Sequence, residues 1–179
     1  MARKKKTVTV KDSQPIIYSG NVTVKKIKNG KIVSTQTMHN AGYNPLFQFL
    51  LNCLAGNYVD KSRPKWIYTC KKDGTGIKYV GNLPNYLNHE PTVLSVKTGS
   101  NENFYIEYKF LLSYSPDFQD GFNCLALYSE NNKPAAFLAG EIISGDYSML
   151  VTMNNDITSN GEDILIIWQL QIENPTVNN

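Results

Sequence analysis

Long apolar segments are missing from this chain of 179 residues. No run reaches the roughly 18 apolar residues that a membrane-spanning helix needs. The basic start of the chain is not followed by the apolar stretch that is typical of a secretory signal. The sequence therefore predicts neither a membrane span nor export through a secretory pathway.

Histidine and cysteine, two residue types that commonly bind zinc, are scarce. His39 and His89 lie far apart in the sequence, with no cysteine or carboxylate pair at a spacing suited to zinc. Cys53, Cys70 and Cys124 form no Cys-x-x-Cys motif, and three cysteines cannot all pair within one chain. We expect reduced cysteines that are buried or half-buried, no metal site and no cofactor.

Catalytic motifs are missing as well. The chain contains no Gly-x-Ser-x-Gly elbow, and Asp117 and Asp120 do not complete the spacing of a calcium loop. Most carboxylates fall in predicted turns, where aspartate commonly bonds nearby backbone N–H groups. They are Asp73, Asp117, Asp120, Asp146, Asp156, Glu162 and Asp163. With no catalytic residue to name, the sequence predicts a protein that is not an enzyme.

Alternating apolar residues and turn signals are what the chain has in abundance. Lys28-Asn29-Gly30-Lys31 predicts a two-residue turn within a hairpin from Ile16 to His39. Ile164 to Ile172 begins apolar on both faces, which predicts a central strand, and its later part points Trp168, Leu170 and Ile172 inward. Further strands are expected at Lys65–Cys70, Val93–Lys97, Phe104–Ser115, Phe122–Ser129, Ala135–Ile143 and Ser148–Met153. The sequence thus predicts a mainly β fold, an antiparallel β-sandwich.

One helix is expected, at about residues 45–55. Asn44 is a good N-cap, Pro45 suits the first helical position, and Gly56 can end the helix in the left-handed conformation. The residues between them are apolar over much more than one stripe. We expect a short buried helix with the strands packed around it.

Positive charge is concentrated at the beginning of the chain. Residues 1–33 carry nine Lys or Arg and one Asp, a balance of +8, and the remainder has a balance of −5. Residues 1–14 are therefore interpreted as a basic, flexible arm, followed by a single domain over 15–179. The arm is either a solvated terminus or a tether that orders on an acidic partner. The candidate partner-binding residues are Arg3, Lys4, Lys5 and Lys6.

The residues suggest two other binding functions. Lysines in the hairpin extend the basic region and have aromatic neighbours, a combination that single-stranded nucleic acid can use. Lysines at a hairpin tip are also common as edge-protecting or solubilising residues, so nucleic acid is not the expected partner. Glycan binding by the many tyrosines is the other alternative. The residues for nucleic acid are Lys25, Lys26, Lys28, Lys31, Tyr18 and Tyr43.

Two segments carry a resemblance to a known group of proteins. The first runs from Gly20-Asn21-Val22-Thr23-Val24 through Asn40-Ala41-Gly42 to Leu46–Gly56. The second comprises Leu125–Ser129, Phe137-Leu138-Ala139-Gly140 and Ile164–Ile172 with its Trp168. Together they resemble small virion proteins of tailed bacteriophages, of the head-fibre, decoration and tail-adaptor types. Cys124 stands where that pattern has glycine, and the middle of the chain is longer.

The resemblance implies a non-enzymatic structural protein of a phage virion, with a head fibre or capsid decoration protein favoured. Its partners would be the capsid or other virion proteins, and it would form a homodimer or homotrimer. It would act in the virion after assembly in the cytoplasm of a host bacterium. A tail or baseplate adaptor and a receptor- or glycan-binding module remain as alternatives.

Overall fold

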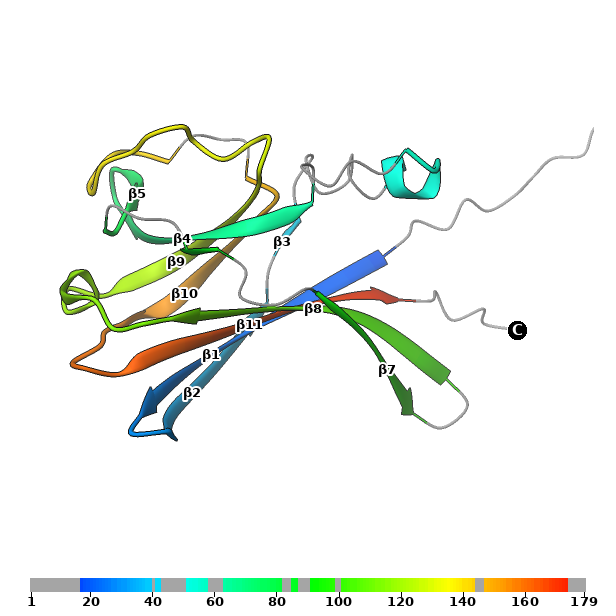
Figure 1. The fold of residues 1–179 in the computed structure, drawn as a ribbon, viewed down its shortest axis with the longest axis horizontal. Coiled ribbons are helices and arrows are strands. Elements are labelled where there is room, and N and C mark those ends of the chain that lie inside the picture. The colour runs from blue at the N-terminus through cyan, green and yellow to red at the C-terminus, as the bar shows by residue number, and fades with distance from the viewer. Residues whose placement is uncertain are drawn as a thin grey trace, which may run out of the picture.

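Two antiparallel sheets make up the computed structural model (Figure 1). It describes residues 17–39, 41–42, 51–57, 63–81, 85–86, 91–98, 101–143 and 147–173. The predicted arm at residues 1–14 and the predicted domain start at residue 15 both lie outside these residues. Within the described ranges the chain is mainly β and sandwich-like, as predicted. No helix in those ranges is long and apolar enough to cross a membrane.

The first sheet contains the predicted hairpin and the predicted central strand. At the hairpin turn Asn29 has φ 52° and Gly30 φ 73°. Both values are positive, as a two-residue turn of type I′ requires, so the predicted turn is confirmed. The strand order is β2-β1-β11-β8-β7. The bounds are Ile17–Lys28 for β1, Lys31–His39 for β2, Thr92–Thr98 for β7, Asn101–Leu112 for β8 and Asp163–Glu173 for β11.

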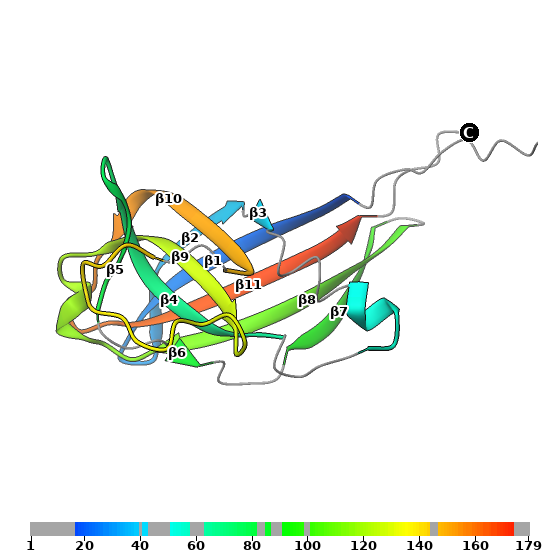
Figure 2. The same cartoon turned by 90° about the horizontal axis from the view of Figure 1, so that it is seen from above.

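The second sheet lies against the first and has the order β3-β10-β9-β4-β5, with β6 paired to β4. A short 3₁₀ helix, η2 (Pro116–Phe118), lies between β8 and β9 in the chain. The strand bounds are Ala41–Gly42 for β3, Pro64–Asp73 for β4, Gly76–Tyr79 for β5, Asn85–Tyr86 for β6, Phe122–Ser129 for β9 and Met149–Ile157 for β10. Figure 2 shows β3 and β10 along the same side of the sandwich as β2.

The core fills the space between the sheets. Val22, Trp168 and Tyr108 form one row across β1, β11 and β8, and all three are almost fully buried. Leu127 and Val151 of the second sheet belong to the same apolar cluster. Because successive strand residues point to opposite faces, one face of each sheet supplies this core.

Strand β11 lies between β1 and β8, so its predicted central position is confirmed. Trp168 and Leu170 are buried as predicted, and the side chain of Ile172 lies outside the described ones. Leu165 and Ile167 face the other way and are only half-buried. The two-sided apolar pattern thus identified the central strand, although no described element buries its outer face fully.

The expectation of a buried helix is wrong for the part that the structure describes. Residues 45–50 lie outside it, and residues 51–54 are helical. Leu51 is 65% exposed and Leu54 is 78% exposed, while Cys53 packs partly against the core. The physical reason is that the two sheets pack directly on each other, so strand side chains already occupy the interior.

The end of this helix is as the sequence predicts. Gly56 has φ +75°, the left-handed conformation that glycine adopts at low cost. Its N–H donates to the carbonyl of Cys53 at 3.1 Å, and the N–H of Asn57 donates to the carbonyl of Asn52 at 2.8 Å. This pair of bonds is a Schellman motif. It satisfies the last carbonyl groups of the helix locally, so the helix can end at Gly56 without being buried.

The prediction of a strand at residues 135–143 is also wrong. Residues 130–143 form an irregular strap that arches over the outer face of the second sheet (Figure 1). Gly140 has φ +86° within it, which a regular strand does not accommodate. Three backbone bonds tie the strap to β5: Tyr79 N to Glu141 O, Gly140 N to Tyr79 O and Ile143 N to Ile77 O, each 2.9 Å.

Candidate partner-binding interface

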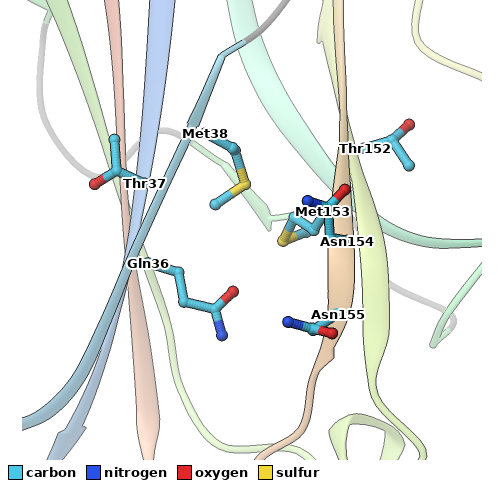
Figure 3. Close-up of a pocket in the computed structure, with 7 residues that line it drawn as sticks. All are labelled: Gln36, Thr37, Met38, Thr152, Met153, Asn154 and Asn155. Atoms are coloured by element: carbon cyan, nitrogen blue, oxygen red, sulfur yellow. The ribbon is translucent and has the colours of Figure 1, made fainter.

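A cleft of about 400 Å³ opens between the edges of the two sheets. Strand β2 lines one wall and strand β10 lines the other (Figure 3). The lining residues are Gln36, Thr37, Met38, Thr152, Met153, Asn154 and Asn155. The two walls come from opposite ends of the chain, so only the packing of the sheets creates this site.

The main chain at both walls has edges that no described strand pairs. β2 pairs only with β1 among the described strands. β10 pairs with β3 only at Met149 and Leu150. Farther along β10, residues 153–156 stand opposite the single β9 residue Asn123, because the register shifts there. Such edges present a row of backbone N–H and C=O groups that can accept another strand.

The side chains in the cleft suit an extended peptide. Figure 3 shows Met38 and Met153 pointing into the gap from opposite walls, with the amides of Gln36 and Asn155 facing each other beside them. Methionine is flexible and adapts to varied apolar partners. Each amide offers both a donor and an acceptor, which matches the groups along a peptide backbone. None of these residues has the charge of a general acid or base.

Large apolar side chains are exposed outside the cleft as well. Ile32 and Val33 lie on β2 beside the hairpin turn and are more than half exposed. Val93 lies on β7, at the opposite edge of the same sheet. Single exposed apolar residues are ordinary, but those on edge strands add apolar area to an edge that can already pair. The remaining ones are Leu51, Leu54, Leu111, Leu138 and Ile142.

The basic residues proposed from the sequence as partner-binding, Arg3, Lys4, Lys5 and Lys6, lie outside the described residues. The structure therefore does not bring them to the cleft or separate them from it. His39 is exposed at the end of β2, and His89 lies outside the described ranges. Among the residues that are described, no three His, Cys, Asp or Glu side chains gather as metal ligands do.

The hairpin lysines do not share one face. Lys25 stands opposite Leu165 on the outer face of the first sheet, and Lys26 stands opposite Ile164, which is buried on the inner face. Lys28 is paired with Glu162 at 3.2 Å. A nucleic-acid groove needs its positive charges along one surface, so this alternative gains no support from the described lysines.

The carboxylates serve mainly in turns, as the sequence indicates. Asp73 accepts hydrogen bonds from the backbone N and the hydroxyl of Thr75, at 2.7 and 2.6 Å, and pairs with Lys78 at 3.2 Å. Asp163 accepts from the backbone N of Tyr114 at 3.0 Å. The bonds from Thr75, followed by Lys78, lower the pKa of Asp73 to about 2.

This lowered pKa predicts an acid dependence of stability. The ordinary pKa of the Asp73 carboxyl is 3.8 and the folded value is about 2, so its stabilisation is present above pH 4 and is lost as the pH falls through 2. We expect Asp73→Asn to melt at a lower temperature than the wild type at pH 7, and the difference to vanish near pH 2. Thermal melts monitored by circular dichroism between pH 7 and pH 2 measure it. A difference that is unchanged at pH 2 would contradict the assignment.

Tyrosines gather on the outer face of the second sheet, where a glycan-binding platform could have been. Tyr68, Tyr79 and Tyr128 are, however, almost fully buried. Phe137 of the strap packs on them, with ring centroids 5.0 Å from Tyr68 and 4.5 Å from Tyr79. A stacking platform for a sugar must be exposed, so these tyrosines stabilise the strap instead. Trp66 is half-buried, with the ammonium of Lys133 4.8 Å from its ring centroid.

The three cysteines are free, as expected. Cys70 and Cys124 face each other across β4 and β9 and are completely buried, whereas Cys53 is partly accessible. Burial raises the pKa of Cys124 to about 11 and holds that of Cys70 well above its ordinary value. Since the thiolate is the reactive form, two of the three thiols are protected twice, by burial and by protonation.

A thiol titration follows from this difference. At pH 8 the folded protein should react rapidly with Ellman's reagent at one thiol, Cys53, and at all three after unfolding. Cys53→Ser should show no rapid reaction when folded and two thiols when unfolded. Two or more rapidly reacting thiols in the folded wild type would contradict the buried positions of Cys70 and Cys124.

The fold and surface define a class, an antiparallel β-sandwich with an open cleft between two sheet edges. Comparisons with family models, curated proteins and solved structures found no match to this chain. The sequence reasoning missed the cleft residues altogether. Gln36 and Met38 look like ordinary residues of a half-buried strand, and no local signal relates them to Met153 or Asn155.

Proposed function

We propose that this chain is a non-enzymatic structural component of a tailed-phage virion, a head fibre or capsid decoration protein that assembles by protein–protein contacts. The resemblance of its two segments to such virion proteins suggests the class. The observation that carries the proposal is the surface of the sandwich. Strand edges that no described strand pairs, with exposed apolar side chains, flank an uncharged cleft. The described carboxylates hold turns and ion pairs. Such a surface is suited to binding another protein and not to catalysis.

The arm provides the attachment in this proposal. Arg3, Lys4, Lys5 and Lys6 repel one another, and residues 1–16 offer only Asp12 as a counter-charge. An acidic capsid surface would relieve that repulsion, and salt would weaken the contact. Each exposed pair contributes about 1 kcal/mol or less, so several residues act together.

Deleting residues 2–6 tests the attachment. Fewer copies should be bound per particle than with the wild type. This difference should be greater at low salt, because high salt already screens the ionic contacts of the wild-type arm. Occupancy is measured by quantitative mass spectrometry of purified particles and by electron microscopy. A matched variant with glutamine in place of Arg3, Lys4, Lys5 and Lys6 keeps the length and removes only charge. Unchanged occupancy for both variants at low and high salt would contradict a role for the arm.

The same particles distinguish the alternatives. Electron microscopy that finds this protein on the tail or baseplate would favour the adaptor. Specific hits on a glycan array, abolished by Trp66→Ala, would favour the receptor- or glycan-binding module. Absence of the protein from purified virions would contradict the proposed class.

A further inference from the structure

We propose that the cleft between β2 and β10 takes residues 7–11 from a second copy of this chain, added as a strand antiparallel to β2. The arm would then link neighbouring copies. This inference rests on the proposed function only for the expectation that several copies meet in one assembly.

The cleft has the features that strand addition requires. The edge of β2 that no described strand pairs supplies backbone donors and acceptors along its length. An added strand would bond to them as in other cases of β-augmentation. The volume of about 400 Å³ is near the lower end of the usual range for binding pockets. It therefore suits a few side chains of a single strand and not a bulky domain.

The sequence of the arm matches this site. Thr7-Val8-Thr9-Val10-Lys11 alternates apolar and polar residues, so an extended segment would present both valines on one face. Met38 and Gln36 have the same spacing on β2, and both stand opposite core residues, Val22 and Val24. Val8 opposite Met38 would enter the gap towards Met153. Val10 would lie opposite Gln36.

Chain length favours a second copy over the same one. With Val8 opposite Met38 in antiparallel pairing, Lys11 would lie level with Lys25 of β1, because Thr35 pairs with Lys25. The return to Ile17 then covers eight strand positions, about 26 Å. The six steps from Lys11 to Ile17 reach at most about 22 Å. The arm is thus too short to make this pairing within its own subunit.

The direction of the added strand has a consequence for the charges. The N-terminal end of an antiparallel strand would lie at the His39 end of β2, and the basic residues precede it in the chain. Arg3, Lys4, Lys5 and Lys6 would extend beyond the cleft and stay available to an acidic surface. Reciprocal exchange of two arms closes a dimer, and cyclic exchange of three closes a trimer.

A matched pair of arm variants tests the proposal in purified, full-length protein without any phage particle. Val8→Ser with Val10→Ser changes the face that enters the cleft, and Thr7→Ser with Thr9→Ser changes the opposite face. Sedimentation equilibrium should give a wild-type dimer or trimer at tens of micromolar. The valine pair should weaken association at least tenfold and the threonine pair less than twofold. Neither pair alters the described domain, so thermal melting serves as a check on folding.

Crosslinking then identifies which copy supplies the strand. Val8→Cys in one tagged population is mixed with Met38→Cys in another, both carrying Cys53→Ser. Oxidation should give a disulfide-linked pair that contains both tags. A monomeric wild type, or equal effects of the two serine pairs, would overturn the inference. So would a variant with both Val8→Cys and Met38→Cys that forms its disulfide within one chain, if no mixed pair forms. Virion occupancy is measured separately, so failure here and failure of the proposed function are distinguishable.

Discussion

Replacing Trp168 with alanine should lower the free energy of unfolding by about 3–5 kcal/mol. Trp168 is completely buried and lies on the central strand β11, between Val22 of β1 and Tyr108 of β8. Truncation removes its apolar contacts and leaves a cavity, because strands on both sides hold the surrounding core in place. Urea denaturation monitored by circular dichroism measures the loss.

The control for this change comes from the helical residues 51–54. Leu54 is largely exposed, so Leu54→Ala should cost less than about 0.5 kcal/mol, as surface substitutions usually do. A loss of several kcal/mol for Leu54→Ala would restore the buried helix that the sequence suggested. A loss below about 1 kcal/mol for Trp168→Ala would mean that the interface between the sheets is not the core.

Replacing Gly121 with alanine should cost about 2–5 kcal/mol, through two separate effects. Gly121 has φ +73°, a conformation that costs an L-residue about 1–2 kcal/mol. A Cβ there would also lie 3.0 Å from Thr158 Cγ2, 3.1 Å from Asp156 Cβ and 3.3 Å from the carbonyl oxygen of Ile157. Such overpacking typically adds about 1–3 kcal/mol.

Gly30 is a matched control for the second effect. It also has φ +73°, but a Cβ at this hairpin turn would meet nothing within 4 Å. Gly30→Ala should therefore cost only the backbone part, about 1–2 kcal/mol. The difference between the two variants, from urea denaturation, measures the crowding between β9 and β10. Equal losses would show that the structure at Gly121 yields without resistance.

Local patterns predicted those parts of the fold whose stability depends on neighbours in sequence. The Asn29-Gly30 turn needs only two residues with positive φ, and the end of the helix at Gly56 needs only a glycine. The strand prediction for residues 135–143 was wrong because most of this apolar run covers the sheet, and only residues 140–143 at its end bond to β5. The side chains of Phe137 and Ile143 pack on the tyrosine cluster. Pro134 and Gly140 lie along the irregular path of this segment.

The burial of the helix was predicted wrongly for a different reason. The apolar residues of a helix do not show how much interior space the strands leave. Composition cannot answer that question, because the same side chains suit a core and an interface between subunits. Leu51 and Leu54 are exposed in the single chain, so an apolar composition alone did not place them in the core.

The sequence by itself determined the class of fold, the hairpin, the central strand and the lack of a catalytic motif. These follow from alternation and turn chemistry, which act over a few residues. Only the tertiary structure decided that Cys70 faces Cys124, that the tyrosines lie beneath a strap and that a cleft lies between β2 and β10. Each of these joins residues far apart in the chain, and such contacts arise from the packing of whole sheets, which no local pattern encodes.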